Sequence, residues 1–303
     1  MTTTGARTGE TTEVQDAPEL TQLAHGYRPA RTLPLRVELV RQVKRRRTLV
    51  MGAVLALLPF VLVAAFAIGG EPGGGGDGGQ RVNLMDTATA SAANFAAVSL
   101  FVSAGFLLVV PVALFFGDTV ASEASWSSLR YLLAAPVPRA RLLWSKLAVA
   151  FGLSLAAMLL LPLVALGVGA VAYGWGPLDI PTGGALPAGT AVQRLLLVVA
   201  FIFVSQLVTA GLAFWLSTKT DNPLGAVGGA VFLTIVGNVL DAVTALGDWR
   251  DFLPAHWQFA WADAIQTQPE WGGMIQGASV SVAYAVVLFA LAFRGFARKD
   301  VVS

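Results

Sequence analysis

The sequence predicts an all-α, polytopic membrane protein with six transmembrane helices, and three observations support this fold class. Hydrophobic residues make up 55% of the 303 residues and charged residues 13%, against roughly 45–50% and 25% in soluble proteins. The apolar residues form long continuous runs, which lack the alternating pattern of a membrane β-barrel. Lysine and arginine are unevenly divided among the segments that connect the runs, as in proteins that follow the positive-inside rule.

Six apolar runs are long enough to cross a bilayer, because about 20 helical residues span a hydrocarbon core of roughly 30 Å. We expect helices over residues 50–70, 95–116, 147–173, 195–216, 224–246 and 277–296. Of the 20 Lys and Arg residues, 17 lie before the first run, at or beyond the C-terminal end of the last run, or in the second-to-third and fourth-to-fifth connections. This distribution predicts a protein of the cell (plasma) membrane with both termini in the cytoplasm.

The chain divides into a polar tail and a membrane domain. Residues 1–33 are rich in Thr, Glu, Pro and Gly and contain few apolar residues, so we expect a disordered cytoplasmic tail. Residues 34–303 are predicted to form one six-span domain. Residues 71–80 include six glycines and are predicted to form a flexible external loop.

The residue types present argue against several kinds of active site. The chain has no cysteine and two histidines, so disulfides, thiolate metal sites and a protein metal cage are not expected. None of its four lysines follows a glycine, as a phosphate-binding loop requires. The net charge of +2 gives no indication of a nucleic-acid partner. We therefore expect no catalytic residue, metal or cofactor in this chain.

A basic segment precedes the first span. Leu35, Leu39 and Val43 recur at helical spacing, and cations such as Arg41 and Lys44 occupy the rest of the circumference. This pattern predicts an amphipathic helix in the inner membrane interface, with its apolar stripe in lipid and its cations at the headgroups. The alternative is a basic flank that only sets the topology.

The connection after the second span is about 30 residues long, more than two adjacent spans need. If it is helical, it has a charged face and an apolar face. The charged face carries Glu123, Ser127 and Arg130, and the apolar face carries Trp126, Leu129 and Leu133. Pro136 and Pro138 end this helix, and Arg139 follows. We expect a protein to dock on this helix, with the apolar side chains as its anchor.

The interfacial helix, the six spans and this connection together resemble the permease subunit of type-2 ATP-binding-cassette (ABC) exporters, over about residues 34–300. The family pattern is matched at Glu123, Leu129, Leu132, Leu133, Pro136, Val137, Arg139 and Lys146, and the chain departs from it at Ser127, Ser128 and Ser145. The resemblance implies that residues 119–135 form the coupling helix, which inserts into a cytoplasmic ABC ATPase subunit. It also implies two permeases, the second being another copy or a paralogue, with two ATPase subunits that bind ATP and Mg.

Candidate residues for a substrate path and an external cap complete the prediction. In the resembled family the second and fifth spans line the subunit interface, and we expect the path residues to come from these spans, as Phe101, Phe106, Thr234 and Asn238. Outside the membrane, Trp257, Trp261 and Ile265 recur at helical spacing and predict a short amphipathic or re-entrant helix at the outer interface. The resemblance implies a cap over the exit, and an aromatic anchor without gating is the alternative.

Two other functions remain open at the level of sequence. The chain would also suit a docking or assembly protein that recruits a cytoplasmic partner without transport. An ion-coupled secondary transporter is a third candidate, but such proteins usually bury several ionisable groups in their spans. Here the best intramembrane carboxylate is Asp241, near the outer end of the fifth span, and we expect it to have an interfacial or packing role.

Overall fold

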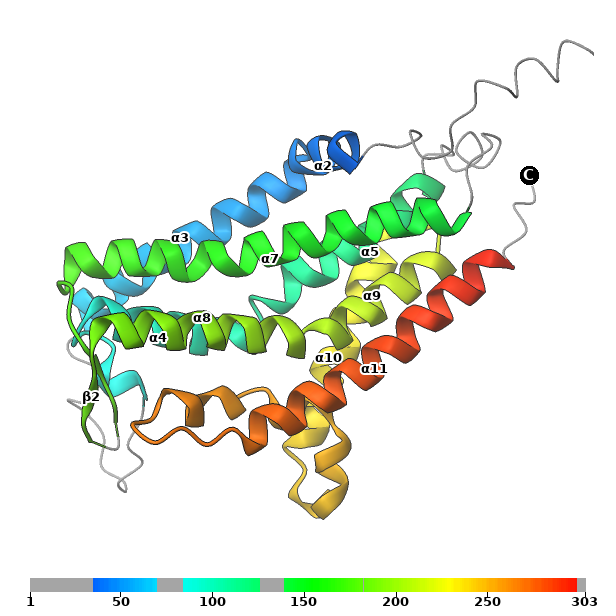
Figure 1. Ribbon diagram of the computed structural model, residues 1–303. Helices are drawn as coiled ribbons and strands as arrows, with labels where there is room; N and C mark the ends of the chain where they lie inside the picture. The colour runs from blue at the N-terminus through cyan, green and yellow to red at the C-terminus, as the bar shows by residue number, and fades with distance from the viewer. Residues whose placement is uncertain (1–34, 70–83, 126–138, 182, 299–303) are drawn as a thin grey trace, which may run out of the picture. The chain divides into compact units, whose positions relative to one another are not determined.

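The computed structural model describes residues 35–69, 84–125, 139–181 and 183–298, all within one compact unit, Leu33–Ser303. Figure 1 shows that nearly all of these residues are helical. The helices of the first half are α2 (Leu35–Val43), α3 (Arg46–Gly69), η2 (Leu84–Thr87), α4 (Ala92–Ala104), α5 (Val109–Ser125) and α7 (Arg139–Ala172). Those of the second half are α8 (Ala188–Ser205), α9 (Leu207–Lys219), α10 (Pro223–Asp241), η3 (Thr244–Phe252), η4 (Pro254–Trp257), η5 (Ala260–Ile265) and α11 (Gly272–Ala297). Between α7 and α8, the strands β1 (Leu178–Asp179) and β2 (Ala185–Leu186) form an antiparallel hairpin.

Five helices of the described part are long and apolar enough to cross a membrane. They span Arg46–Gly69, Ala140–Ala172, Ala188–Lys219, Pro223–Asp241 and Gly272–Ala297. A sixth crossing is obtained only if α4 and α5, which are bent by 53° relative to one another, are counted as one span. The prediction of an all-α fold with several membrane-spanning helices is confirmed, and the count of six stays a prediction.

The run predicted as one helix over residues 95–116 is two helices, separated at residues 105–108. Pro111 in the first turn of α5 has no N–H to donate to the carbonyl of Leu107, which loosens the helix there. Near the break the Leu108 N–H donates to the Ser103 carbonyl five residues back, at 2.9 Å. The Ser99 hydroxyl also donates to the Phe95 carbonyl at 2.8 Å, a bond that competes with the regular helical pattern.

Helix α7 begins eight residues earlier than the run predicted over residues 147–173. With 34 residues it is about 51 Å long, which exceeds the roughly 30 Å of a hydrocarbon core. Its first turns therefore extend beyond the apolar run and bring Lys146 alongside α2 and α5.

The buried core lies among α4, α5, α7, α8 and α9, whereas α3, α10 and α11 expose much of their apolar surface. Phe116 of α5 packs at 5.0 Å from the ring of Phe151 and at 6.1 Å from that of Phe289. On the surface of the helix bundle, Leu57, Phe232 and Val286 are each about 60% exposed. Exposed apolar rows of this kind are the surface that a helix presents to lipid.

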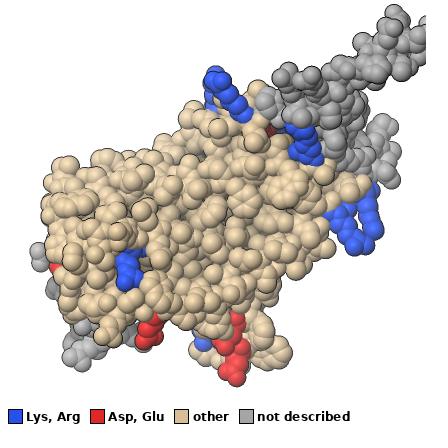
Figure 2. Space-filling view, in the orientation of Figure 1, with Lys and Arg blue, Asp and Glu red and all other residues tan. Residues whose placement is uncertain are grey.

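Charge is divided between the two ends of the helices. Basic residues lie on α2, at the starts of α3 and α7, and at the ends of α9 and α11. Acidic side chains gather over the 3-10 helices that follow α10, as Figure 2 shows for one face. We refer to these as the basic end and the acidic end. The positive-inside rule predicts that the basic end lies at the cytoplasmic surface, and this orientation stays a prediction.

Candidate functional site

Seven charged side chains at the basic end connect α2 and α3 with α5 and α7. We call this group the inner ion cluster; its members are Glu38, Arg41, Arg45, Arg47, Asp118, Glu123 and Lys146. The two acids of α5 are five residues apart and each binds a different set of cations. The cluster thus fastens one helix to three others.

The first half of the cluster surrounds Glu123. Lys146 Nζ donates to Glu123 Oε1 at 2.9 Å and lies 3.4 Å from Glu38 Oε1. Arg41 pairs with Glu123 as well as with Glu38, the latter at 2.7 Å. The side chains of Lys146 and Glu123 are 2% and 3% exposed. The pair is therefore buried, and each charge depends on the other.

The second half of the cluster surrounds Asp118. Arg45 pairs with its carboxylate, and Arg47 Nη1 lies 2.8 Å from Asp118 Oδ1. On a neighbouring face of α5, the Ser217 hydroxyl of α9 accepts the N–H groups of Val120 and Ala121 at 3.1 and 3.0 Å. The inner part of α5 is thus held by α2, α3, α7 and α9 together.

Glu38 owes its ionisation to the cluster. Burial raises the pKa of its carboxyl, but the positive charges of Lys146 and Arg41, together with hydrogen bonds from Arg41 and Gln42, outweigh this effect and hold the pKa below its ordinary value. The carboxylate is thus stabilised in its charged form. Removing one partner from such a buried pair leaves a charge without compensation, at a cost of about 3–5 kcal/mol.

Several residues predicted at the partner interface fall in different places. Glu123, expected to contact the ATPase, is buried and paired within the chain. Residues 119–125 of the expected coupling helix are a continuation of α5, so they do not form a separate element. Arg139 is the first residue of α7. The predicted docking residues Trp126, Ser127, Leu129, Arg130 and Leu133 lie outside the described residues, as do Pro136 and Pro138.

Helix α2 has an exposed apolar face and a buried polar face. Leu35, Leu39 and Val43 are 53%, 41% and 40% exposed, so the apolar stripe is free to contact lipid. The opposite face buries Glu38 and Gln42 against the cluster. Arg41 belongs to the cluster, although it was expected among the headgroup cations, and Lys44 is exposed.

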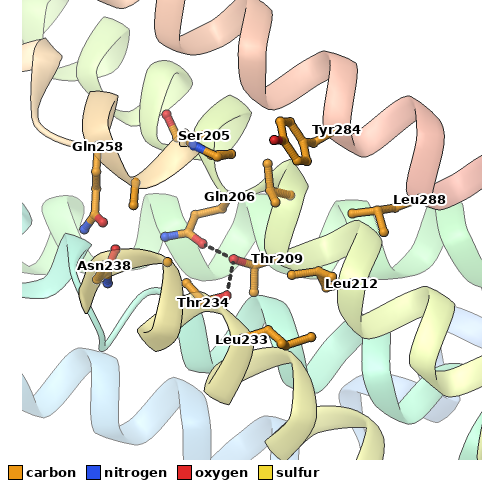
Figure 3. A pocket seen from close by; sticks show the side chains of 14 residues that line it. Ser205, Gln206, Thr209, Leu212, Leu233, Thr234, Asn238, Gln258, Tyr284 and Leu288 are labelled. Carbon is orange, nitrogen blue, oxygen red and sulfur yellow. Dashed lines mark hydrogen bonds between the residues drawn. The ribbon is translucent and has the colours of Figure 1, made fainter. Parts of the chain in front are cut away.

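A cavity of about 310 Å³ lies between α9, α10, α11 and η4 (Figure 3). Two of the four residues predicted for the substrate path, Thr234 and Asn238, line it. The other two do not: Phe101 packs on Phe259 with ring centroids 5.1 Å apart, and Phe106 is 55% exposed. The cavity is lined by Ser205, Gln206, Val208, Thr209, Leu212, Leu233, Thr234, Gly237, Asn238, Pro254, Ala255, Gln258, Tyr284 and Leu288.

Hydrogen bonds connect this cavity to the break between α4 and α5. Gln206, in the short break between α8 and α9, donates from Nε2 to the carbonyl of Ala104, the last residue of α4, at 3.4 Å. Thr209 donates to Gln206 Oε1 at 3.0 Å, and its hydroxyl lies 3.1 Å from that of Thr234. The two dashed bonds in Figure 3 follow this chain from Gln206 to α10. A single Gln in an apolar run is visible in sequence, but its partner across 102 residues is not.

The outer segment differs from the predicted amphipathic helix. Trp257, Trp261 and Ile265 would share one face of a regular helix, but the chain forms separate 3-10 helices, η4 and η5, interrupted at Gln258 and Phe259. Trp261 and Ile265 are 0% and 3% exposed, so they belong to the core and do not form an outward stripe. Trp257 lies against Gly277 of α11, where an added Cβ would come within 2.4 Å of the Trp257 Cβ.

Asp241 is fixed in a polar group at the acidic end. Its Oδ1 lies 2.7 Å from His256 Nδ1 and 3.2 Å from Arg250 Nε, and His256 Nε2 is 3.5 Å from Asp251 Oδ1. These contacts attach η3 and η4 to the end of α10, which supports a packing role for Asp241. The part of the chain that the structure describes contains no group of three or more His, Cys, Asp or Glu residues suited to a metal ion.

Comparison with known proteins gives one family. The family described as "Protein of unknown function (DUF2705)" matches residues 82–302. This stretch includes α5, α7 and all the residues that line the cavity, whereas α2 and α3 precede it. A search of curated proteins finds no match.

Proposed function

The chain belongs to the DUF2705 family of proteins of unknown function, and we propose that it is the membrane-spanning subunit of an ATP-driven ABC exporter. ATP would be bound and hydrolysed by a separate cytoplasmic subunit. The observation that supports this proposal best is the course of α5, which joins the inner ion cluster to the neighbourhood of the cavity. The resemblance of residues 118–146 to the permease subunits of such exporters points the same way.

At its inner end α5 leads directly into the segment predicted to dock on the ATPase. The helix continues without interruption to Ser125, so it includes residues 119–125 of the predicted coupling helix. The predicted docking residues from Trp126 onward follow it in the sequence. Glu123 and Lys146 bring the end of α5 and the start of α7 together on either side of that segment. A displacement of the segment would therefore be delivered to both helices.

At its outer end α5 meets the cavity through the break. The carbonyl of Ala104 accepts from Gln206, and an added Cβ on Gly105 would lie 3.4 Å from Nε2 of Gln258. Both glutamines line the cavity. The distance along α5 from Val109 to Glu123 is about 21 Å. A rigid helix of this length can transmit a movement between the inner ion cluster and the cavity if the membrane domain has two discrete conformations.

The direction of transport then depends on the partner. ATP binding can change the permease only if the ATPase subunits bind its two conformations with different free energies. Export of cargo from the membrane or cytoplasm toward the acidic end fits a cavity that η4 borders on that side. The two copies of the permease implied by the resemblance would each contribute one α5.

The alternatives predict other features. A docking protein without transport has no use for a cavity hydrogen-bonded to a helix break. An ion-coupled transporter would place ionisable groups at its binding site. The cavity described here is lined only by uncharged side chains.

The proposal is tested by measuring whether ATP hydrolysis by the partner is coupled to export through this chain. The full chain is purified with its ATPase, reconstituted into liposomes, and ATP hydrolysis and export are measured for wild type and for Arg130→Glu. Arg298→Glu, a charge reversal at an exposed residue at the end of α11, is the matched control. We expect Arg130→Glu to abolish coupled activity while the control retains it. Wild-type coupling in both variants would contradict the assignment of the docking segment.

A further inference from the structure

The cavity between α9, α10, α11 and η4 is chemically uniform in one respect: every residue that lines it is uncharged. Leu212, Leu233 and Leu288 supply apolar walls, and the polar atoms come from amides and hydroxyls. At about 310 Å³ it is within the range of roughly 300–1,000 Å³ typical of small-molecule sites. An ion in this setting would find no opposite charge to compensate its desolvation.

Two polar atoms at the cavity lack hydrogen-bond partners among the described residues. They are Ser205 Oγ and Gln258 Nε2, and both atoms are buried. Leaving such a buried donor unpaired is energetically unfavourable. Three other polar residues of the lining, Gln206, Thr209 and Thr234, are hydrogen-bonded to one another. The amide of Gln258 and the hydroxyl of Ser205 can each donate to a hydrogen-bond acceptor of an occupant.

The exposure of the lining residues indicates the side from which an occupant enters the cavity. Helix α9 packs against both α10 and α11, and η4 borders the cavity with Pro254 and Ala255. Two of the lining residues, Leu233 of α10 and Tyr284 of α11, are 41% and 45% exposed. They belong to the exposed apolar faces of the two helices, so the cavity opens toward lipid.

From these observations we infer that the cavity binds a neutral amphiphile whose uncharged polar group accepts hydrogen bonds, such as an ester, ether or ketone, and whose apolar chain leaves between α10 and α11. Gln258 and Ser205 donate to the polar group. Leu233 and Tyr284 flank the chain at the opening. In Figure 3 Gln258 and Asn238 lie on one side of the site, and Tyr284 and Leu288 on the other. That this amphiphile is the transported cargo rests on the proposed exporter function; the binding itself does not.

The test is photolabelling of the purified full chain in phosphatidylcholine nanodiscs, without any ATPase. The probe is a monoacylglycerol with a diazirine in its acyl chain. Two probes with the same chain serve for comparison, the anionic free fatty acid and a cationic alkyltrimethylammonium. We expect the neutral probe to label peptides of α10, α11 and η4 saturably, with competition by unlabelled monoacylglycerol, and the charged probes to label these peptides much less.

Three variants locate the contact. Gln258→Leu removes the donor and is expected to weaken binding of the neutral probe roughly five- to tenfold, the effect of one hydrogen bond of about 1–1.4 kcal/mol. Gly237→Leu fills the cavity and should abolish saturable labelling. Ser279→Ala is the control, because Ser279 is exposed on α11 and its hydroxyl bonds only to the Ile275 carbonyl of its own helix.

The outcomes separate this inference from the exporter proposal. Equal labelling by all three probes, or unsaturable labelling of the wild type, would overturn the inference whatever the variants do. Labelling that fails while ATP hydrolysis remains coupled to the chain leaves the exporter proposal intact. If the chain is labelled specifically but has no ATPase partner, the binding site is supported and the exporter proposal is contradicted.

Discussion

Lys146 of α7 donates to Glu123 of α5 at 2.9 Å, and neither side chain is more than 3% exposed. The two residues lie on either side of the segment 126–138, which holds the predicted docking residues. Their contact therefore joins the helix that enters this segment to the helix that leaves it. A force on the segment therefore acts on both α5 and α7, which the ion pair holds together next to the segment.

The first prediction concerns this pair. Lys146→Met leaves Glu123 and Glu38 buried with less positive charge, so we expect a loss of about 3–5 kcal/mol in the free energy of unfolding. Arg47→Met, at a side chain that is 60% exposed, should cost about 1 kcal/mol or less. Denaturation of both variants in detergent measures the difference.

A double substitution separates the charge from the packing. Glu123→Gln together with Lys146→Met removes both charges and should restore at least about 1 kcal/mol relative to the sum of the single effects. Additive effects would mean that the two charges do not stabilise one another in the folded protein.

The second prediction concerns acid. Since the pKa of Glu38 is lowered by folding, its charged form stabilises the protein fully above its ordinary pKa of 4.5, and this contribution is lost as the pH falls through the lower pKa of the folded state. Glu38→Gln should thus be less stable than wild type near neutral pH, with the gap closing below about pH 4.5. Thermal unfolding from about pH 7 to about pH 3 measures the gap, and a gap that widens in acid would refute the assignment.

The third prediction concerns the contact between α11 and η4. At Gly277 a methyl group would meet Trp257 Cβ at 2.4 Å, so Gly277→Ala must displace η4 and is expected to cost about 1–3 kcal/mol. Gly228 of α10 has no atom within 4 Å of an added Cβ, and Gly228→Ala should gain about 0.5–1 kcal/mol from helix propensity. Equal stability of the two variants would show that η4 is not packed on α11.

The fourth prediction concerns orientation, which the absence of cysteine makes simple to measure. Single cysteines are introduced at Lys44, directly after α2, and at Asp248 on η3, both exposed. A membrane-impermeant maleimide should label Asp248→Cys in intact cells and should reach Lys44→Cys only after the membrane is opened. The reverse pattern would place the predicted docking segment outside the cell and exclude a cytoplasmic ATPase.

Most of the helices could be predicted from hydropathy, because a helix in lipid must be both long and apolar. The break between α4 and α5 could not be predicted in this way, since a hydropathy window averages over Pro111 and Gly105. The early start of α7 was also missed, because its first turns are polar and lie beyond the apolar run. The apolar stripe of α2 can be predicted from the spacing of Leu35 and Leu39, but the burial of Glu38 and Gln42 on the other face cannot.

The site was only partly visible. Glu123 and Lys146 stand out as charges near the ends of apolar runs, but their pairing depends on how α5 and α7 pack. The same holds for Thr234 and Gln206, whose neighbours come from other helices. The spacing of Trp257, Trp261 and Ile265 predicts an outward stripe only if the segment is one regular helix. Because the segment forms two 3-10 helices, the side chain of Trp261 points into the core.

The most direct test of the exporter proposal is affinity purification of the full chain from its native membrane, with the co-purifying proteins identified and quantified by mass spectrometry. The proposal predicts a stoichiometric cytoplasmic ATPase with a phosphate-binding loop, recovered with the wild type and lost with Arg130→Glu. Recovery of the intact chain without any nucleotide-hydrolysing subunit would contradict it.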